Sequence, residues 1–258
     1  MKGNKKSKGK IIIVSNRLPV TISKRKDELK IQQSPGGLAT CLRAIQEEEE
    51  AIFVGWPGYW PANDKEKKSI ENDLINNYKS YPVFISPAEI GKYYYGFANR
   101  TLWPLFHYFS TYCAYEESEW IAYKRVNEKF FQKVFDLAGP QDTFWIHDYH
   151  LMLLPALIRK SFPQSSIGFF LHIPFPSSEI FRTLPWREEI LEGLLGADLI
   201  GFHTYEYARH FLNSVLLLLG YEHEFGTILV DNRIVKVENF PMGIDSLGLK
   251  NLLEESSI

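Results

Sequence analysis

The segment WIHDYHLMLLP, residues 145–155, joins an apolar run to a helical pattern through a polar turn. Residues Thr143–His147 have the apolar character of a buried strand, and Leu151–Ser161 has the apolar spacing of a helix. A second apolar stretch, Ile167–His172, reads as the next strand. This order predicts a parallel βαβ unit, with Asp148 in the loop at the carboxyl end of the first strand.

The same alternation extends from this unit in both directions. Strands are predicted at 10–15, 51–55, 81–85 and 198–202, with two more in 224–239 that are joined at Asp231-Asn232. Helices are predicted at 35–50, 64–78, 117–138, 186–195 and 205–219, near Glu179, and from the capping box at Ser86–Glu89. A polar loop is predicted after the first strand. The pattern indicates an α/β fold: a Rossmann-like, mostly parallel sheet with helices on both faces.

Charge argues against nucleic acid as the main partner. The formal net charge is −2, but five lysines lie in the first ten residues, which contain no acid. Without them, 24 basic residues face 31 acidic ones. We expect residues 1–9 to be a disordered basic tail.

The two cysteines form no metal or redox motif, and no apolar run could span a bilayer, so we expect a cytoplasmic protein without a membrane partner.

Polar or aromatic residues follow five of the predicted strands. They are Ser15-Asn16-Arg17, Trp56, His147-Asp148, His172 and His203. Carboxyl ends of parallel strands meet at one edge of a sheet, which is where ligands bind in such folds. The sequence therefore predicts a binding crevice at this edge.

Several of these groups suit a phosphorylated sugar, although each has a purely structural alternative. Arg17 could bind a phosphate or form a surface salt bridge. Gly36-Gly37 could present backbone amides to a phosphate or simply begin a helix. Asp148 could accept hydrogen bonds from sugar hydroxyls or act as a base. Neither GxGxxG nor GxxxxGK[ST] occurs, so the dinucleotide fingerprint and the P-loop are absent.

The neighbouring histidines and aromatic residues allow similar alternatives. His147 and His150 could be metal ligands, but no third ligand is evident, so we expect no metal and a structural His147. Tyr94 and Trp103 could stack on sugar faces, or they could pack in the core.

Seven segments, taken together, resemble the trehalose-6-phosphate synthase family (glycosyltransferase family 20). They are SNRLPV, SPGGLAT, FVGWPG, YYYGFANRTLWPLFHY, WIHDYHLMLLP, GFFLHIPFPSSEIFR and ADLIGFHTYEYARHF. The resemblance implies that residues 10–245 form the N-terminal, acceptor-side, Rossmann-like domain of a GT-B fold. Residues 246–258 would begin the crossover to a C-terminal donor domain that this chain lacks.

The resemblance also implies an activity and a set of roles. The family transfers glucose from UDP-glucose to glucose 6-phosphate with retention of configuration, and we expect no cofactor. Arg17 would hold the acceptor phosphate, and Asp148 would bind acceptor hydroxyls. Trp56, Tyr94 and Trp103 would line the acceptor pocket, with Tyr94 reaching the phosphate.

On the donor side, Gly36 and Gly37 would bind the UDP-glucose phosphates. His172 would contact the donor glucose, and Ile173 would help select the anomeric geometry. Asp148 and His172 are thus the expected catalytic residues.

We expect this chain alone to bind sugar phosphate weakly and to turn over UDP-glucose negligibly, because the second domain would grip UDP. Two other classes stay open: a regulatory, synthase-like domain that binds sugar phosphates without catalysis, and a different GT-B enzyme. A homo-oligomer is also possible.

Overall fold

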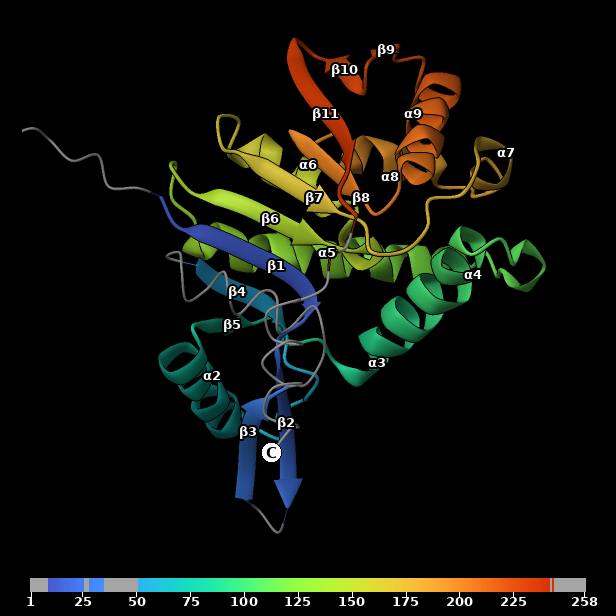
Figure 1. The fold of residues 1–258 in the computed structure, drawn as a ribbon. Coiled ribbons are helices and arrows are strands. Elements are labelled where there is room, and N and C mark those ends of the chain that lie inside the picture. The colour runs from blue at the N-terminus through green and yellow to red at the C-terminus, as the bar shows by residue number, and fades with distance from the viewer. Residues whose placement is uncertain (1–8, 26–27, 35–50, 242, 244–258) are drawn as a thin grey trace, which may run out of the picture.

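The architecture is built on one sheet of nine strands. The computed structural model describes residues 9–25, 28–34, 51–241 and 243. The strand order is β5-β4-β1-β6-β7-β8-β11-β10-β9 (Figure 1). The parallel strands are β5 (Ser80–Pro82), β4 (Ala51–Trp56), β1 (Ile11–Arg17), β6 (Thr143–His147), β7 (Ile167–Phe170), β8 (Leu199–Phe202) and β11 (Arg233–Asn239). Antiparallel β10 (Thr227–Val230) and β9 (His223–Glu224) form the edge, so the predicted mostly parallel sheet is confirmed.

Helices cover both faces of the sheet because side chains alternate along each strand. Ile12 and Val14 of β1 belong to the larger core, whereas Ile13 belongs to the smaller one. The helices that pack on the larger core include α5 (Glu117–Leu137), α6 (Leu154–Ser161), α8 (Arg187–Leu194) and α9 (Tyr205–Leu219). On the smaller core lies α2 (Asp64–Tyr78), through Ile70 and Leu74.

The predicted capping box begins an unusual helical stretch. Ser86 accepts a hydrogen bond from the Glu89 amide at 3.3 Å, and the Glu89 carboxylate accepts one from the Ser86 amide at 2.9 Å. The helix α3 (Pro87–Ile90) continues into a π-helix, η1 (Gly91–Leu102), and then α4 (Trp103–Phe106). A 3₁₀ turn, η2 (Ser110–Tyr112), follows. The π-helix was not predicted, and it carries the Tyr93-Tyr94-Tyr95 run.

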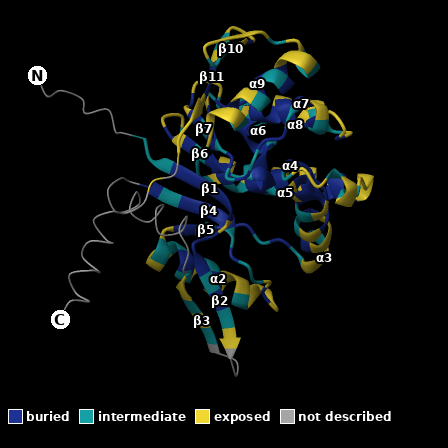
Figure 2. Cartoon of the chain, turned by 45° about the vertical axis from the view of Figure 1, so that its right-hand side comes forward, coloured by how far each residue is buried: buried dark blue, intermediate teal, exposed yellow. Residues whose placement is uncertain are grey.

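The predicted polar loop after the first strand is wrong. This part of the chain forms a hairpin, β2 (Val20–Arg25) and β3 (Glu28–Gln33), with Ile22 opposite Ile31. Val20 and Ile22 are buried in the smaller core, and that burial is what holds the hairpin against the sheet. In Figure 2 its far end carries the exposed colour, whereas the central strands are buried.

Several predicted boundaries shift at the strand and helix ends. Pairing of β5 with β4 ends at Pro82, so the strand stops short of Ile85. The strand β7 ends at Phe170, which leaves His172 in the loop beyond it. Before α6, a 3₁₀ turn η3 (Tyr149–Leu151) replaces the expected first helical turn, and Pro155 stands in the first turn of the helix proper.

The other helices and strands predicted inside the described residues are present, with ends shifted by no more than a few residues, and the short edge strand β9 was not predicted. A short helix, α7 (Ser178–Phe181), lies at Glu179. Asp231 and Asn232 have φ angles of 46° and 63° and join β10 to β11, as their turn-forming character predicts. The predicted helix at 35–50 and residues 246–258 lie outside the described residues, as does all of the predicted tail except Gly9.

Candidate functional site

The residues predicted at the strand ends do gather at one edge of the sheet. In register, Ser15 of β1 pairs with His147 of β6, His147 with Phe170 of β7, and Phe170 with Gly201 of β8. The polar residues just beyond these positions are therefore neighbours. We call the group Arg17, Trp56, Tyr94, His147, Asp148, His150, His172 and His203 the strand-end cluster.

Asp148 occupies a strained backbone position. Its φ and ψ are 76° and 166°, a region that side chains other than glycine rarely adopt. The surroundings hold it there: its amide donates to the Phe170 carbonyl at 2.8 Å, and its carboxylate accepts from the His172 amide at 3.3 Å. The carboxylate is thereby fixed beside the loop that carries His172.

Burial raises the pKa of Asp148 to about 6, although hydrogen bonds from the Tyr149 and His172 amides oppose the shift. The side chain still keeps 23% of its surface exposed, so a ligand can reach it. Near neutral pH the group is mostly ionised but poorly solvated. A poorly solvated carboxylate accepts hydrogen bonds from sugar hydroxyls readily.

Three histidines, at or just beyond the ends of the adjacent strands β6, β7 and β8, follow one another in a row of contacts. The Nδ1 of His147 lies 3.0 Å from the Nε2 of His172, and the rings of His172 and His203 are 5.6 Å apart. Burial lowers the pKa of His147 to about 3 and that of His172 to about 4. Both imidazoles are therefore neutral at physiological pH and cannot supply positive charge to a substrate.

His150 connects Asp148 to the aromatic residues of the cluster. Its Nδ1 lies 3.9 Å from the Asp148 carboxylate, and its ring stacks on that of Tyr94 at 5.5 Å and 8°. Burial lowers the pKa of His150 to about 3, so this close approach joins a neutral imidazole to a carboxylate. Neither ring nitrogen of His150 has a hydrogen-bond partner among the described residues.

A row of side chains in contact continues from Tyr94 through Trp56 to Arg17 at the end of β1. The rings of Tyr94 and Trp56 are 6.2 Å apart, and the Arg17 guanidinium lies 4.8 Å from the centre of the Trp56 ring. Gly58 makes this possible: a Cβ there would lie 2.0 Å from a guanidinium nitrogen of Arg17. Arg17 is thus an exposed cation resting on an indole, a suitable arrangement for a phosphate.

The other predicted site residues have different surroundings. Trp103 is 45% exposed, and its ring lies 5.8 Å from that of Tyr149, which in turn lies 3.9 Å from the His150 ring. Ile173 is buried in the larger core, next to His172 in the chain. Gly36 and Gly37 lie outside the described residues.

Two contacts of the site were not predicted from the sequence: that of His147, predicted as structural, with His172, and that of His150 with Tyr94. Tyr93 also fixes the site, because its hydroxyl donates to Asn16 at 2.9 Å and so ties the π-helix to the end of β1. The described residues contain no group of three or more His, Cys, Asp and Glu side chains placed to hold a metal ion.

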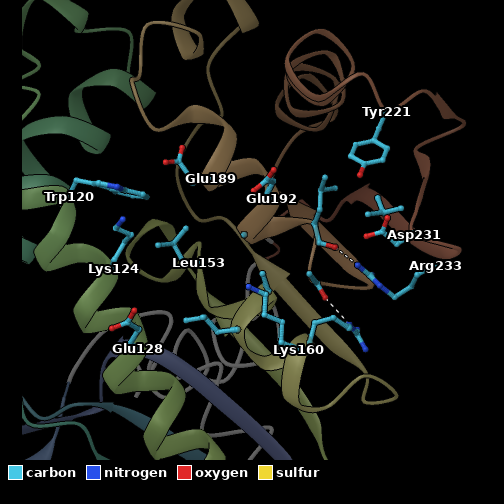
Figure 3. Close-up of a pocket in the computed structure, with 17 residues that line it drawn as sticks. Trp120, Lys124, Glu128, Leu153, Lys160, Glu189, Glu192, Tyr221, Asp231 and Arg233 are labelled. Atoms are coloured by element: carbon cyan, nitrogen blue, oxygen red, sulfur yellow. Dashed lines mark hydrogen bonds between the residues drawn. The ribbon is translucent and has the colours of Figure 1, made fainter. Parts of the chain in front are cut away.

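A hollow lies away from the strand ends, between α5, α6, α8 and the β10–β11 turn (Figure 3). Its volume is about 470 Å³, and its lining includes Trp120 and Lys124. Its two arginines are already engaged. Arg159 donates to the carbonyls of Gly196, Pro163 and Ser165, and Arg233 donates to those of Leu195 and Ala197. The hydrogen bonds in this hollow therefore hold loops together.

Comparisons with known proteins agree with this geometry. The glycosyltransferase family 20 model matches residues 9–258. The bifunctional trehalose-6-phosphate synthase/phosphatase of Thermoproteus tenax is 48% identical over 263 residues, which cover 96% of this chain and 35% of that protein.

Two solved structures have the same fold. A UDP-forming α,α-trehalose-phosphate synthase of Burkholderia xenovorans, in complex with glucose-6-phosphate, has a TM-score of 0.78 at 27% identity. It matches 96% of this chain and 53% of its own. The N-terminal domain of Candida albicans trehalose-6-phosphate phosphatase has a TM-score of 0.79 at 32% identity, over 99% of this chain and 55% of its own.

The chain thus spans between about a third and a little over half of the length of these relatives. The fold is that of the N-terminal half of a GT-B protein, as predicted. Among the described residues, no helix combines the length and the apolar character that crossing a bilayer requires. On its sequence and its fold alike, the chain belongs to glycosyltransferase family 20.

Proposed function

We propose that the chain is the acceptor-side part of an α,α-trehalose-6-phosphate synthase, which transfers glucose from UDP-glucose to glucose 6-phosphate with retention. The observation that carries the proposal is the continuous contact from Arg17 through Trp56, Tyr94 and His150 to Asp148. It supplies a cation at one end, a carboxylate at the other and rings between. A hexose phosphate has the matching order of an anion and a hydroxylated ring.

The proposed roles follow from this order. Arg17 binds the acceptor phosphate, with Tyr94 beside it, and Asp148 orients acceptor hydroxyls. Trp56 and Trp103 shape the acceptor side. The likeness to the synthase solved with glucose-6-phosphate supports these assignments.

His172 contacts the donor glucose, and Ile173 supports the loop that carries it. Gly36 and Gly37 face the donor phosphates. UDP-glucose as the donor, a cytoplasmic location and a homo-oligomer stay predictions.

The chemistry at Asp148 favours reaction on one face of the donor sugar. Retention by double displacement uses two carboxylates about 5 Å apart. Burial raises the pKa of Asp148, and no second carboxylate among the described residues contributes to the shift. In the proposed reaction the acceptor hydroxyl attacks the anomeric carbon as its bond to UDP breaks. The proton passes to the departing phosphate oxygen, so the protein contributes mainly positioning.

Calorimetric titration with glucose 6-phosphate tests the acceptor site directly. We expect Arg17→Ala to weaken binding at least about tenfold, because a charge-assisted phosphate contact is lost. Arg209→Ala is the matched control, since Arg209 forms only an exposed pair with Glu206 on α9. Equal binding by the wild type and Arg17→Ala would reject this site, and glucose should bind both proteins alike.

A second candidate is a sugar-phosphate-binding domain without synthase activity. It is favoured by the likeness to the N-terminal domain of the Candida albicans phosphatase. Both candidates predict binding of glucose 6-phosphate, but only the synthase predicts release of UDP by the full-length protein. We expect this chain alone to turn over UDP-glucose negligibly, and rapid turnover by residues 1–258 would contradict that expectation.

A further inference from the structure

The surroundings of the hydrogen bond between His147 and His172 indicate which ring is the donor and which is the acceptor. His147 closes β6 and is 1% exposed, and its ring packs 4.7 Å from that of Trp145. His172 lies two residues beyond β7, and its backbone amide donates to Asp148. Its imidazole is thus held from two sides, by Asp148 through the backbone and by His147 through Nε2.

One of the two rings donates in this hydrogen bond and the other accepts. Both imidazoles are neutral near pH 7, because burial lowers the pKa of each well below that value. A neutral imidazole carries one proton, on either Nδ1 or Nε2. The 3.0 Å contact joins Nδ1 of His147 to Nε2 of His172, so the proton lies on one of these two atoms.

The remaining nitrogen of His147 decides between the two arrangements. Its Nε2 is buried and has no hydrogen-bond partner among the described residues. If His172 donated, the proton of His147 would have to sit on this Nε2, as a buried N–H without an acceptor. Orphaned buried N–H groups are rarer than unused acceptors, because desolvating the donor is costly. The arrangement with a lone pair on Nε2 of His147 is therefore favoured.

We propose that His147 is a positioning residue that donates from Nδ1 to Nε2 of His172 and so fixes the tautomer of His172 with its proton on Nδ1. Nε2 of His172 is then occupied and unavailable as a base. Its Nδ1–H makes no hydrogen bond among the described residues, and the ring is only half-buried. His172 thus offers a rigid donor, which suits a sugar hydroxyl oxygen.

The hydroxyl contact rests on the proposed function, whereas the tautomer does not. Second-sphere partners commonly fix the tautomer and the orientation of a functional histidine in this way. The inference assigns His147 a role that the sequence reasoning had described as merely structural.

Two-bond ¹H–¹⁵N correlation spectra of histidine-labelled protein report tautomers directly. We expect the wild-type spectrum to show His172 protonated on Nδ1 and His147 also protonated on Nδ1. A His172 protonated on Nε2 would overturn the inference, whatever the protein binds. This readout needs neither substrate nor activity, so it is independent of the proposed function.

Two variants sharpen the test. His147→Asn can place an amide N–H near the position of Nδ1 and should keep the Nδ1–H form of His172. His147→Leu fills the space without a donor and should give a mixture of tautomers. Thermal melting checks that each variant is folded, and the wild-type spectrum decides the question if either is not. Identical His172 signals in the wild type and a folded His147→Leu would contradict the role of His147.

Addition of UDP-glucose then separates the two claims. If His172 has the expected tautomer and its Nδ1–H signal shifts with ligand, both the inference and the donor assignment hold. If the tautomer is as expected but UDP-glucose leaves the signal unchanged at concentrations where calorimetry shows that it is bound, the donor assignment fails and the role of His147 stands.

Discussion

The strand-end cluster and the hollow of Figure 3 differ in how their polar groups are used. In the hollow, Arg159 and Arg233 donate to carbonyls and to Asp198, so their hydrogen-bonding capacity is spent within the fold. Among the described residues, seven buried side-chain N and O atoms lack a partner, and five of them belong to the strand-end cluster. They are Trp56 Nε1, His147 Nε2, both ring nitrogens of His150, and His203 Nδ1.

Unused hydrogen-bonding capacity therefore distinguishes the two regions. Buried polar groups without partners are rare in folded proteins and need a reason. The strained backbone of Asp148 also indicates a functional role for the strand ends, because such strain is found mostly at functional sites. Changes in the hollow should mainly affect stability, whereas changes in the cluster should mainly affect binding.

The largest expected loss of stability is that of Arg159→Ala. Its side chain is 14% exposed, and the substitution removes the side-chain donor to three carbonyls and one of the donors to Asp198, which keeps those of Ile167 and Arg233. We expect the free energy of unfolding to fall by about 3 kcal/mol, with little change in the affinity for glucose 6-phosphate. Denaturant unfolding measures the loss, and Arg209→Ala is again the control. If Arg159→Ala is folded but no longer binds glucose 6-phosphate, the hollow contributes to binding and the contrast between the two regions is wrong.

Asp148→Asn should have the opposite effect on stability. The folded pKa of about 6 lies above the usual value near 4, so the folded state holds its proton more tightly than the unfolded chain. Stability from this group is present below pH 4 and is lost as the pH rises to 6. Two pKa units correspond to about 3 kcal/mol, which partial exposure reduces to about 2 kcal/mol.

We therefore expect Asp148→Asn to be about 2 kcal/mol more stable than the wild type at pH 7 and equally stable at pH 4, while it binds glucose 6-phosphate more weakly. Unfolding curves at the two pH values give the comparison. A variant that is less stable at pH 7 would show that the carboxylate is there for the fold.

A smaller effect is expected for Gly58→Ala, with Gly220→Ala as its matched control. The φ angles are 73° and 76°, so the backbone strain is similar, about 1 kcal/mol in each case. A Cβ at Gly58 would meet the Arg17 guanidinium, whereas one at Gly220 would meet nothing within 4 Å. Only Gly58→Ala should weaken phosphate binding. Equal affinities in titrations of the two variants would mean that the placement of Arg17 is unimportant.

The sequence predicted the edge of the site better than its internal contacts. Five parallel strands, β1, β4, β6, β7 and β8, end in or are followed by a polar or aromatic residue, and the parallel order of the strands brings those residues to one edge. The contact of His147 with His172 spans 25 residues and depends on the register between β6 and β7, which local patterns do not reveal.

The two missed elements have different causes. The hairpin β2–β3 has alternating apolar residues, but its turn lacks a glycine or asparagine signal, and its stability comes from packing on the smaller core. The π-helix segment GKYYYGFANRTL is rich in residues of modest helix propensity, so tertiary contacts such as that of Tyr93 with Asn16 decide its form.

The indole N–H signals of the tryptophans test the central claim most directly. Trp56 and Trp103 lie at or beside the strand-end cluster, whereas Trp120 lines the hollow. On titration with glucose 6-phosphate, the signals of Trp56 and Trp103 should shift and that of Trp120 should stay in place. A shift of Trp120 with Trp56 and Trp103 unmoved would place the ligand in the hollow and contradict the assignment of the strand-end cluster as the sugar-phosphate site.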